Sequence, residues 1–174
     1  MTKKQQGFSL IELLIVVAII LIIAAISIPN LLRSRMAANE ASAVGSIRTI
    51  NVAAVMYQTT YGGYPATIAQ IGTTGTAIGC NNAGLIDSVL TTGIKSGYNI
   101  AIVAGTVPIP SSAVPTGCTT AYADGYVVTA TPTTVGTTGQ RAFCSDASGV
   151  IRSNASGTAS YTSPMCNESQ TPLQ

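Results

Sequence analysis

The feature that most constrains this chain is an apolar run near its N-terminus that holds a single carboxylate. The 21 residues from Phe8 to Ile28 are uncharged except for Glu12, and the next charged residue is Arg33. As a helix this run is roughly 30 Å long, which matches the thickness of a bilayer core. Besides Glu12 only two serines are polar, so the run lacks the polar stripe of a helix on a soluble core. We therefore predict that residues 8–28 span a membrane.

The charges before the run predict its orientation. Lys3 and Lys4 precede it, and positive residues favour the cytoplasmic side, so we expect everything after the run to lie outside the cytoplasm. A cleaved secretory signal peptide is the first alternative, because residues 25–27 have small-x-small character. The run is longer than the apolar core of about 7 to 15 residues in a signal peptide, it contains Glu12, and Pro29 follows it closely. These features argue against a signal peptide.

At these residues the chain resembles type IV pilins and their relatives, the pseudopilins of type II secretion systems. The resemblance covers the leader at residues 1–7, the block from Phe8 to Ile20, and the segment from Ala24 to Pro29. It implies that a prepilin peptidase cuts between Gly7 and Phe8 on the cytoplasmic side, and that the new Phe8 amine is methylated. The apolar helix then remains in the mature protein.

The resemblance also implies a role for Glu12. An ionised carboxylate in a membrane span is costly unless another group neutralises it, and no basic side chain lies near Glu12 in its own helix. In the family, this carboxylate pairs with the cationic Phe8 amine of a neighbouring copy, so the charge is neutralised only when copies assemble in register. The alternative is a simple membrane anchor in which Glu12 is incidental.

A second helical segment is predicted to continue the first without a break. Apolar or small residues recur at steps of three and four and mark one helix face: Ala43, Ile47, Ile50, Ala54, Tyr57 and Tyr61. Gly62, Gly63 and Pro65 predict the end at Tyr61. We thus expect one helix from Phe8 to Tyr61, roughly 80 Å long.

Pro29 interrupts this predicted helix. It has no amide hydrogen and frees the carbonyl of Ala25, so we expect a kink near Pro29. Many pilins carry a helix-breaking glycine where this chain has Leu21, and here no glycine occurs between Phe8 and Gly45. How far the helix melts upstream of Pro29 is therefore left open.

The composition after Tyr61 shifts to Gly, Thr, Ser, Ala and Val, which favours strands and loops. Short helical turns are predicted at 68–71 and 83–90. Alternating or β-branched stretches predict four strands: Gly97–Val103, Gly125–Ala130, Arg141–Ser145 and Gly149–Arg152. The turn at 145–149 should join the last two as a hairpin, and the Thr-rich and Gly-rich stretch at 131–139 is expected to be an exposed loop.

These predictions combine into an α+β fold. A long N-terminal helix, with its apolar half in the membrane and a kink near Pro29, should pack on a small sheet of three or four antiparallel strands, as in pilins. The domain boundaries we expect are a cleaved leader at 1–7, a polymerisation helix at 8–28, an amphipathic helix at 29–61 and a head at 62–174.

The four cysteines are Cys80, Cys118, Cys144 and Cys166. All follow the predicted span and therefore lie on its oxidising side, where disulfides form. Four cysteines allow three pairings. We favour Cys80 with Cys118 and Cys144 with Cys166, because the resemblance to pilins implies a disulfide that fastens the C-terminal tail to the sheet.

The residue inventory argues against an enzyme. The chain has no histidine and only six acidic residues, one of them in the span, so no base, metal cluster or phosphate-binding glycine loop stands out and no cofactor is expected. Asp87, Asp124 and Asp146 have calcium-binding chemistry but lack a close-spaced motif, which favours turn and cap roles. No basic tract marks a dedicated nucleic-acid site.

Three functions fit the sequence. The first is a structural subunit of a type IV pilus, a helical homo-oligomer for adhesion, motility or DNA uptake. The second is a pseudopilin of type II secretion, and the third is a membrane-anchored periplasmic binding domain. The first two imply prepilin peptidase and an assembly platform in the inner membrane as partners. A pilin would lie in that membrane before assembly and in an extracellular filament afterwards.

Overall fold

The computed structural model describes residues 8–73, 75, 77–110, 115, 117–118 and 124–173. The chain forms two compact units, Met1–Arg35 and Met36–Gln174, and each is described by itself. The predicted leader at 1–7, including Gly7 of the expected cleavage site, lies outside the described residues.

Helix α1, Leu10–Tyr61, supplies residues to both units. It begins at Leu10 rather than at Phe8, so the predicted start was wrong by two residues. The reason is that Ser9 flanks the helix, its carbonyl accepting the first helical bond, 3.2 Å from the amide nitrogen of Leu13. The predicted end at Tyr61 is confirmed, and Gly62 follows it with a φ of 84°, the left-handed conformation that ends many helices.

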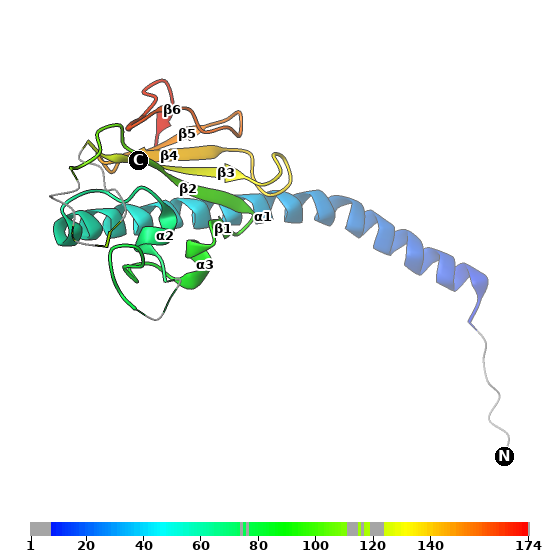
Figure 1. Cartoon of the computed structure of the whole chain (residues 1–174). Helices are drawn as coiled ribbons and strands as arrows, with labels where there is room; N and C mark the ends of the chain where they lie inside the picture. The colour runs from blue at the N-terminus through cyan, green and yellow to red at the C-terminus, as the bar shows by residue number, and fades with distance from the viewer. Residues whose placement is uncertain are drawn as a thin grey trace, which may run out of the picture. The chain divides into compact units, whose positions relative to one another are not determined.

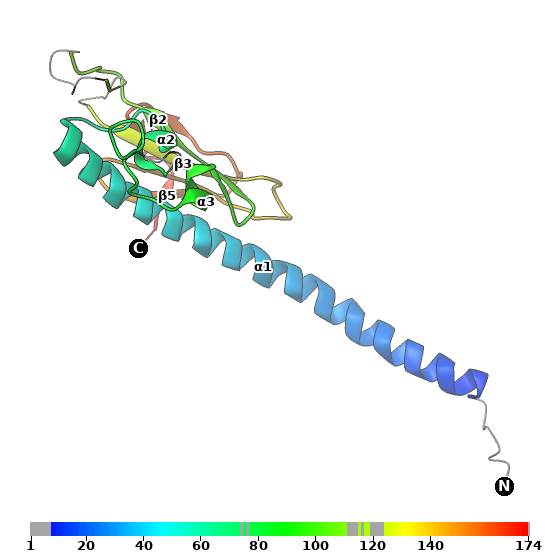
Figure 2. The same cartoon turned by 60° about the horizontal axis from the view of Figure 1, so that its bottom comes forward.

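The second unit is built on the C-terminal half of α1, which lies along one face of an antiparallel sheet (Figures 1 and 2). The predicted helix face is confirmed, because Ala43, Ile47, Ile50, Ala54 and Tyr57 are all buried and Tyr61 packs against them. From the sheet, alternate residues Tyr98, Ile100 and Ile102 enter the same core. The predicted α+β architecture is therefore confirmed.

The main sheet has six strands in the order β1-β2-β3-β4-β5-β8, with β6 and β7 forming a separate two-stranded pair. The bounds are β1 Ile94–Lys95, β2 Tyr98–Ala104, β3 Tyr126–Pro132, β4 Ala142–Asp146, β5 Ile151–Asn154, β6 Tyr161–Thr162, β7 Met165–Cys166 and β8 Thr171–Pro172. The four predicted strands correspond to β2 to β5, which pair antiparallel in chain order. The expected count of three or four was too low, because two-residue strands have no alternation to recognise.

Two smaller expectations also needed correction. Strand β3 runs on to Pro132, where Thr131 pairs with Asn99, so the predicted loop starts at Thr133 rather than Thr131. Threonine is a good strand former, and the Thr-rich and Gly-rich composition hid this continuation.

Helix α2, Ile68–Ile71, lies where predicted, whereas α3 is Ser88–Thr91 and not 83–90. The amide of Ala83 donates to the carbonyl of Gln70, and the amide of Leu85 donates to the carbonyl of Ile71. Residues 83–86 are thus occupied by pairing with the α2 segment, and α3 begins only after Asp87 caps it.

The described cysteines form two disulfides, Cys80–Cys118 and Cys144–Cys166, the pairing that the sequence analysis favoured. Cys144 lies in β4 and Cys166 in β7, and both are buried beside Val127. The second disulfide therefore fastens the β6–β7 pair to the sheet.

Candidate functional site

The first turn of α1 positions Glu12. Its Oε2 accepts a hydrogen bond from the backbone N–H of Ser9, at 3.3 Å. Glu12 is the third residue of the helix, so this contact is the reach-back half of a capping box. A carboxylate is also favoured here by the positive end of the helix dipole. Sequence reasoning missed this local role, although the Ser-x-x-Glu spacing from Ser9 to Glu12 is its signature.

Among the described residues, no cation pairs with the carboxylate of Glu12. The ion pairs there are Lys95–Asp87 and Arg141–Glu40. A cut after Gly7 would create an amine on Phe8, one residue before the amide that Glu12 already contacts. The two groups of the expected assembly pair thus lie at the same end of the helix.

The apolar half of α1 is uncovered in the first unit. Phe8 is 79% exposed, and the large apolar side chains that follow it up to Ile28 are exposed as well. The helix is long and apolar enough to cross a membrane. Exposed apolar surface on this scale marks a membrane or protein contact. Pro29 lies inside the continuous helix, and the kink expected there stays a prediction.

A buried carboxylate that sequence reasoning did not single out ties α1 to the sheet in the second unit. Glu40 Oε1 accepts from the backbone N–H groups of Gln140 and Arg141 at 2.9 and 3.1 Å, and Glu40 Oε2 accepts from Arg141 Nε at 2.9 Å. Beside it, the Asn39 side-chain amide donates to the carbonyl of Thr138 at 2.8 Å. We call these residues, Asn39, Glu40, Thr138, Gln140 and Arg141, the helix clasp.

The clasp controls the ionisation of Glu40. Burial acts to raise the pKa of this carboxyl, but the hydrogen bonds from Gln140 and Arg141 and the guanidinium charge outweigh burial and hold the pKa below its ordinary value of 4.5. The only signal in the sequence was a lone acid three residues before Ala43, the first residue of the predicted apolar face, and its partner lies about 100 residues away.

The three aspartates considered for calcium make bonds within the chain. Asp87 caps α3 by accepting from the amide of Leu90 at 2.8 Å, Asp124 accepts from the amide of Thr106 at 2.7 Å, and Asp146 accepts from the amide of Cys166 at 3.0 Å. Hydrogen bonds lower the pKa of Asp124 to about 2. The largest effect comes from the Thr106 hydroxyl, and backbone amides add to it. Within the described residues no group of His, Cys, Asp and Glu is arranged to hold a metal ion.

Comparisons with known proteins bear on the N-terminal region. Residues 2–28 match the family described as the prokaryotic N-terminal methylation motif. The chain is 60% identical over 38 residues to the type IV wide pilus major component PilA4 of Thermus thermophilus, a stretch covering 22% of this chain and 29% of that protein.

Relatives in secretion systems are similar over a longer stretch. Identity to the type II secretion system core protein G of Escherichia coli is 36% over 66 residues, which cover 38% of this chain and 46% of that protein. For the Vibrio cholerae protein of the same name, identity is 38% over 65 residues, with 37% and 44% covered. The chain therefore spans less than half the length of these curated relatives. No solved structure matches it.

The predicted resemblance is confirmed by these matches. The chain carries the N-terminal methylation motif and is similar to both a type IV pilus component and secretion proteins G. These relatives are named as components of pili and secretion systems.

Proposed function

We propose that this chain is a structural subunit of a type IV pilus, and that its N-terminal helix assembles copies into an extracellular filament. The observation that carries the proposal is an uncovered apolar helix that begins with one carboxylate, Glu12, within a matched methylation motif at residues 2–28. A membrane covers such a helix before assembly, and neighbouring copies cover it afterwards. The two disulfides suit a filament exposed to an oxidising exterior.

The assembly step proposed here begins with cleavage. Prepilin peptidase removes residues 1–7, and the Phe8 amine is then methylated. The amine of one copy pairs with Glu12 of a neighbour, and the buried carboxylate becomes neutralised. An assembly platform in the inner membrane would bring copies together for this step.

Substitution of Glu12 tests the proposal. We expect Glu12→Gln and Glu12→Val to insert in the membrane and to be cleaved as the wild type is, but to give few or no filaments, because the Phe8 amine then has no anion to meet. Filament microscopy and N-terminal sequencing of the shed material measure this. Normal filaments from both variants would rule out the pairing, and a monomer that keeps residues 1–7 would support the membrane-anchored binding domain.

The pseudopilin function is the second candidate, because several relatives are secretion proteins G and match over a longer stretch than the pilus component does. Both candidates share the same N-terminal step. They differ in product, since a pilin gives long surface filaments composed mainly of this chain, whereas a pseudopilin gives short periplasmic assemblies. Electron microscopy of cells at native expression level separates them.

A further inference from the structure

Where the predicted span ends, helix α1 carries a small hollow with apolar and charged walls. The hollow has a volume of about 340 Å³ and is lined by Ile28, Leu31, Leu32 and Arg35, all in the first unit. Residues at this spacing lie on one side of a helix, and all four side chains are exposed. We call these four residues the boundary stripe.

The boundary stripe ends in a positive charge. Among the described residues, neither Arg35 nor the nearby Arg33 forms an ion pair, and the sequence has no acidic residue between Glu12 and Glu40. A guanidinium group can bind a phosphate through two parallel hydrogen bonds. The stripe therefore combines a group that suits phosphate with three side chains that suit a hydrocarbon chain.

Length along the helix puts this combination at the surface of a bilayer. Measured from Leu10, where α1 begins, Leu31 lies roughly 32 Å and Arg35 roughly 38 Å along the axis. A hydrocarbon core is about 30 Å thick, and a bilayer with its headgroups measures about 40 to 45 Å. With Leu10 at one edge of the core, Leu31 lies at the other edge. The Arg35 side chain, which leans toward the helix N-terminus, then reaches the headgroups.

We propose that the boundary stripe binds an anionic phospholipid, with the phosphate on Arg35 and an acyl chain along Ile28, Leu31 and Leu32. The proposal rests on the membrane insertion of the helix in the function above and not on filament assembly. The orientation predicted from the basic leader puts this lipid in the leaflet that faces away from the cytoplasm. An anionic lipid is favoured over a neutral one because Arg33 adds a second positive charge at nearly the same level.

Lipid retention by the full chain tests this site. The chain is reconstituted in vesicles of phosphatidylethanolamine and phosphatidylglycerol in equal parts and extracted in mild detergent, and the lipids that remain bound are counted by native mass spectrometry. The wild type should retain more phosphatidylglycerol than phosphatidylethanolamine. Arg35→Gln should lower the ratio of the anionic to the neutral lipid about fivefold, the effect expected for one arginine at an anionic lipid surface.

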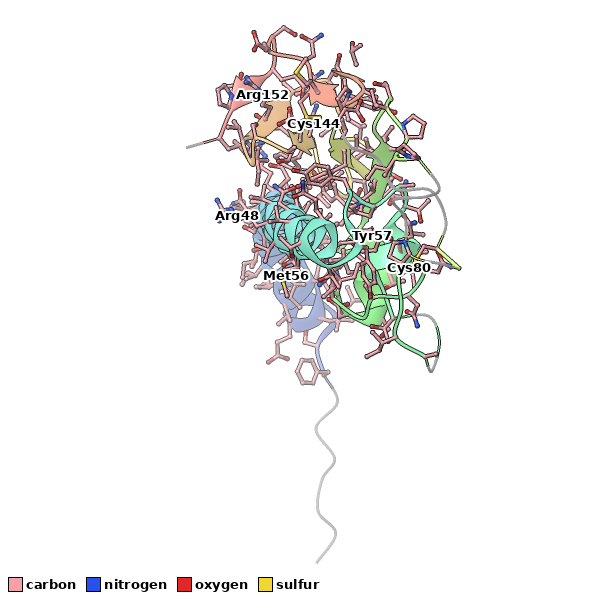
Figure 3. All side chains as sticks on the ribbon, turned by 60° about the vertical axis from the view of Figure 1, so that its left-hand side comes forward. Arg48, Met56, Tyr57, Cys80, Cys144 and Arg152 are labelled. Atoms are coloured by element: carbon pink, nitrogen blue, oxygen red, sulfur yellow. A yellow bond between two sulfur atoms is a disulfide. The ribbon has the colours of Figure 1, made fainter. Side chains whose placement is uncertain are left out.

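Two other arginines of the same helix provide matched controls. Arg33 lies near the level of Arg35 but does not line the hollow, so Arg33→Gln should lower the ratio about twofold or less. Arg48 lies roughly 20 Å further along the helix than Arg35, and Figure 3 shows it on the side of α1 opposite Tyr57. Arg48→Gln should leave the ratio unchanged. All three substitutions change exposed side chains, so the unfolding midpoint in detergent should stay the same.

The outcomes separate the lipid site from the membrane insertion on which it rests. Equal ratios for Arg35→Gln and the wild type would overturn the site. Equal losses from Arg33→Gln and Arg35→Gln would also overturn it, because they would indicate a general attraction to headgroups. Flotation of the vesicles reports insertion. A wild-type chain that does not float with them would overturn the membrane-inserted helix, whereas insertion without selective retention of phosphatidylglycerol would overturn the lipid site alone.

Discussion

Glu40 joins α1 to the segment that leads into β4. Its two carboxylate oxygens accept from two backbone amides and from the guanidinium of Arg141, and the carboxylate is 10% exposed. Charged hydrogen bonds of this kind are stronger than those between neutral groups. The clasp therefore fixes α1, near the start of the second unit, against the segment that leads into β4.

We predict that Glu40→Gln lowers the free energy of unfolding of the head by about 1.5 to 3 kcal/mol, because the charged bonds to Arg141 are lost. Denaturant unfolding of the full chain in detergent at pH 7 measures this. Lys95→Gln is the matched control, since it breaks an ion pair whose side chains are 34% and 51% exposed; it should cost less than about 1 kcal/mol. A larger loss from the control would contradict the importance given to the clasp.

The clasp also predicts a pH dependence. The pKa of Glu40 is lower in the folded chain than its ordinary value of 4.5, so the folded state favours the ionised form. The resulting stability is present above pH 4.5 and is lost as the pH falls through the folded pKa. The difference in unfolding free energy between wild type and Glu40→Gln should therefore shrink as the pH is lowered from above 4.5 through the folded pKa. A constant difference across this range would show that Glu40 acts through packing alone.

Among the elements, those with strong periodicity were predictable and the short ones were not. Apolar residues recur at steps of three and four in helix α1 and alternate in strand β2. The predicted face of α1 is buried or packs against the core, although Ser46 and Ala53, which are buried with it, were not predicted. Strands β1, β6, β7 and β8 have two residues each and exist because longer neighbours offer a free edge or because a disulfide holds them. Tertiary pairing of this kind leaves little local signal.

Two exposed glycines allow the effect of backbone conformation on stability to be measured apart from steric contacts. A Cβ would meet nothing within 4 Å at either Gly45 or Gly149, but Gly149, in the β4–β5 turn, has a φ of 75°. Gly45→Ala should therefore raise the unfolding free energy by about 0.5 to 1 kcal/mol, since alanine favours the helix. Gly149→Ala should lower it by about 1 to 2 kcal/mol, because a side chain opposes the left-handed conformation. Shifts of the same sign in thermal unfolding would contradict this reading.

At the scale of the whole molecule, site residues that lie close together in the sequence were predictable. Contacts between residues far apart in the sequence were not. Phe8, Glu12 and the apolar helix were recognisable because their meaning depends on spacing within about 20 residues. The clasp joins Glu40 to Arg141, 101 residues further along the chain. It has no local sequence pattern, so it could be found only from the fold.

The two disulfides differ in the length of the loop they close and in the burial of their cysteines. On the chain-entropy account both contribute about 3 to 4 kcal/mol, with slightly more for Cys80–Cys118, whose sequence separation is 38 against 22. Core packing acts in the opposite direction, because Cys144 and Cys166 are only 0% and 4% exposed and pack against Val127, whereas Cys80 is 8% exposed and Cys118 is only partly buried. Removing their sulfur atoms leaves a cavity as well as a longer free loop.

We therefore predict that Cys144→Ala with Cys166→Ala lowers the unfolding free energy more than Cys80→Ala with Cys118→Ala does, by about 1 to 2 kcal/mol. Because Cys166 fastens the β6–β7 pair, hydrogen exchange should rise at residues 161–166 in the first double variant and stay unchanged there in the second. Denaturant unfolding and exchange of the oxidised full chains measure both effects. A larger loss from the Cys80 and Cys118 variant would show that loop closure outweighs core packing in this head.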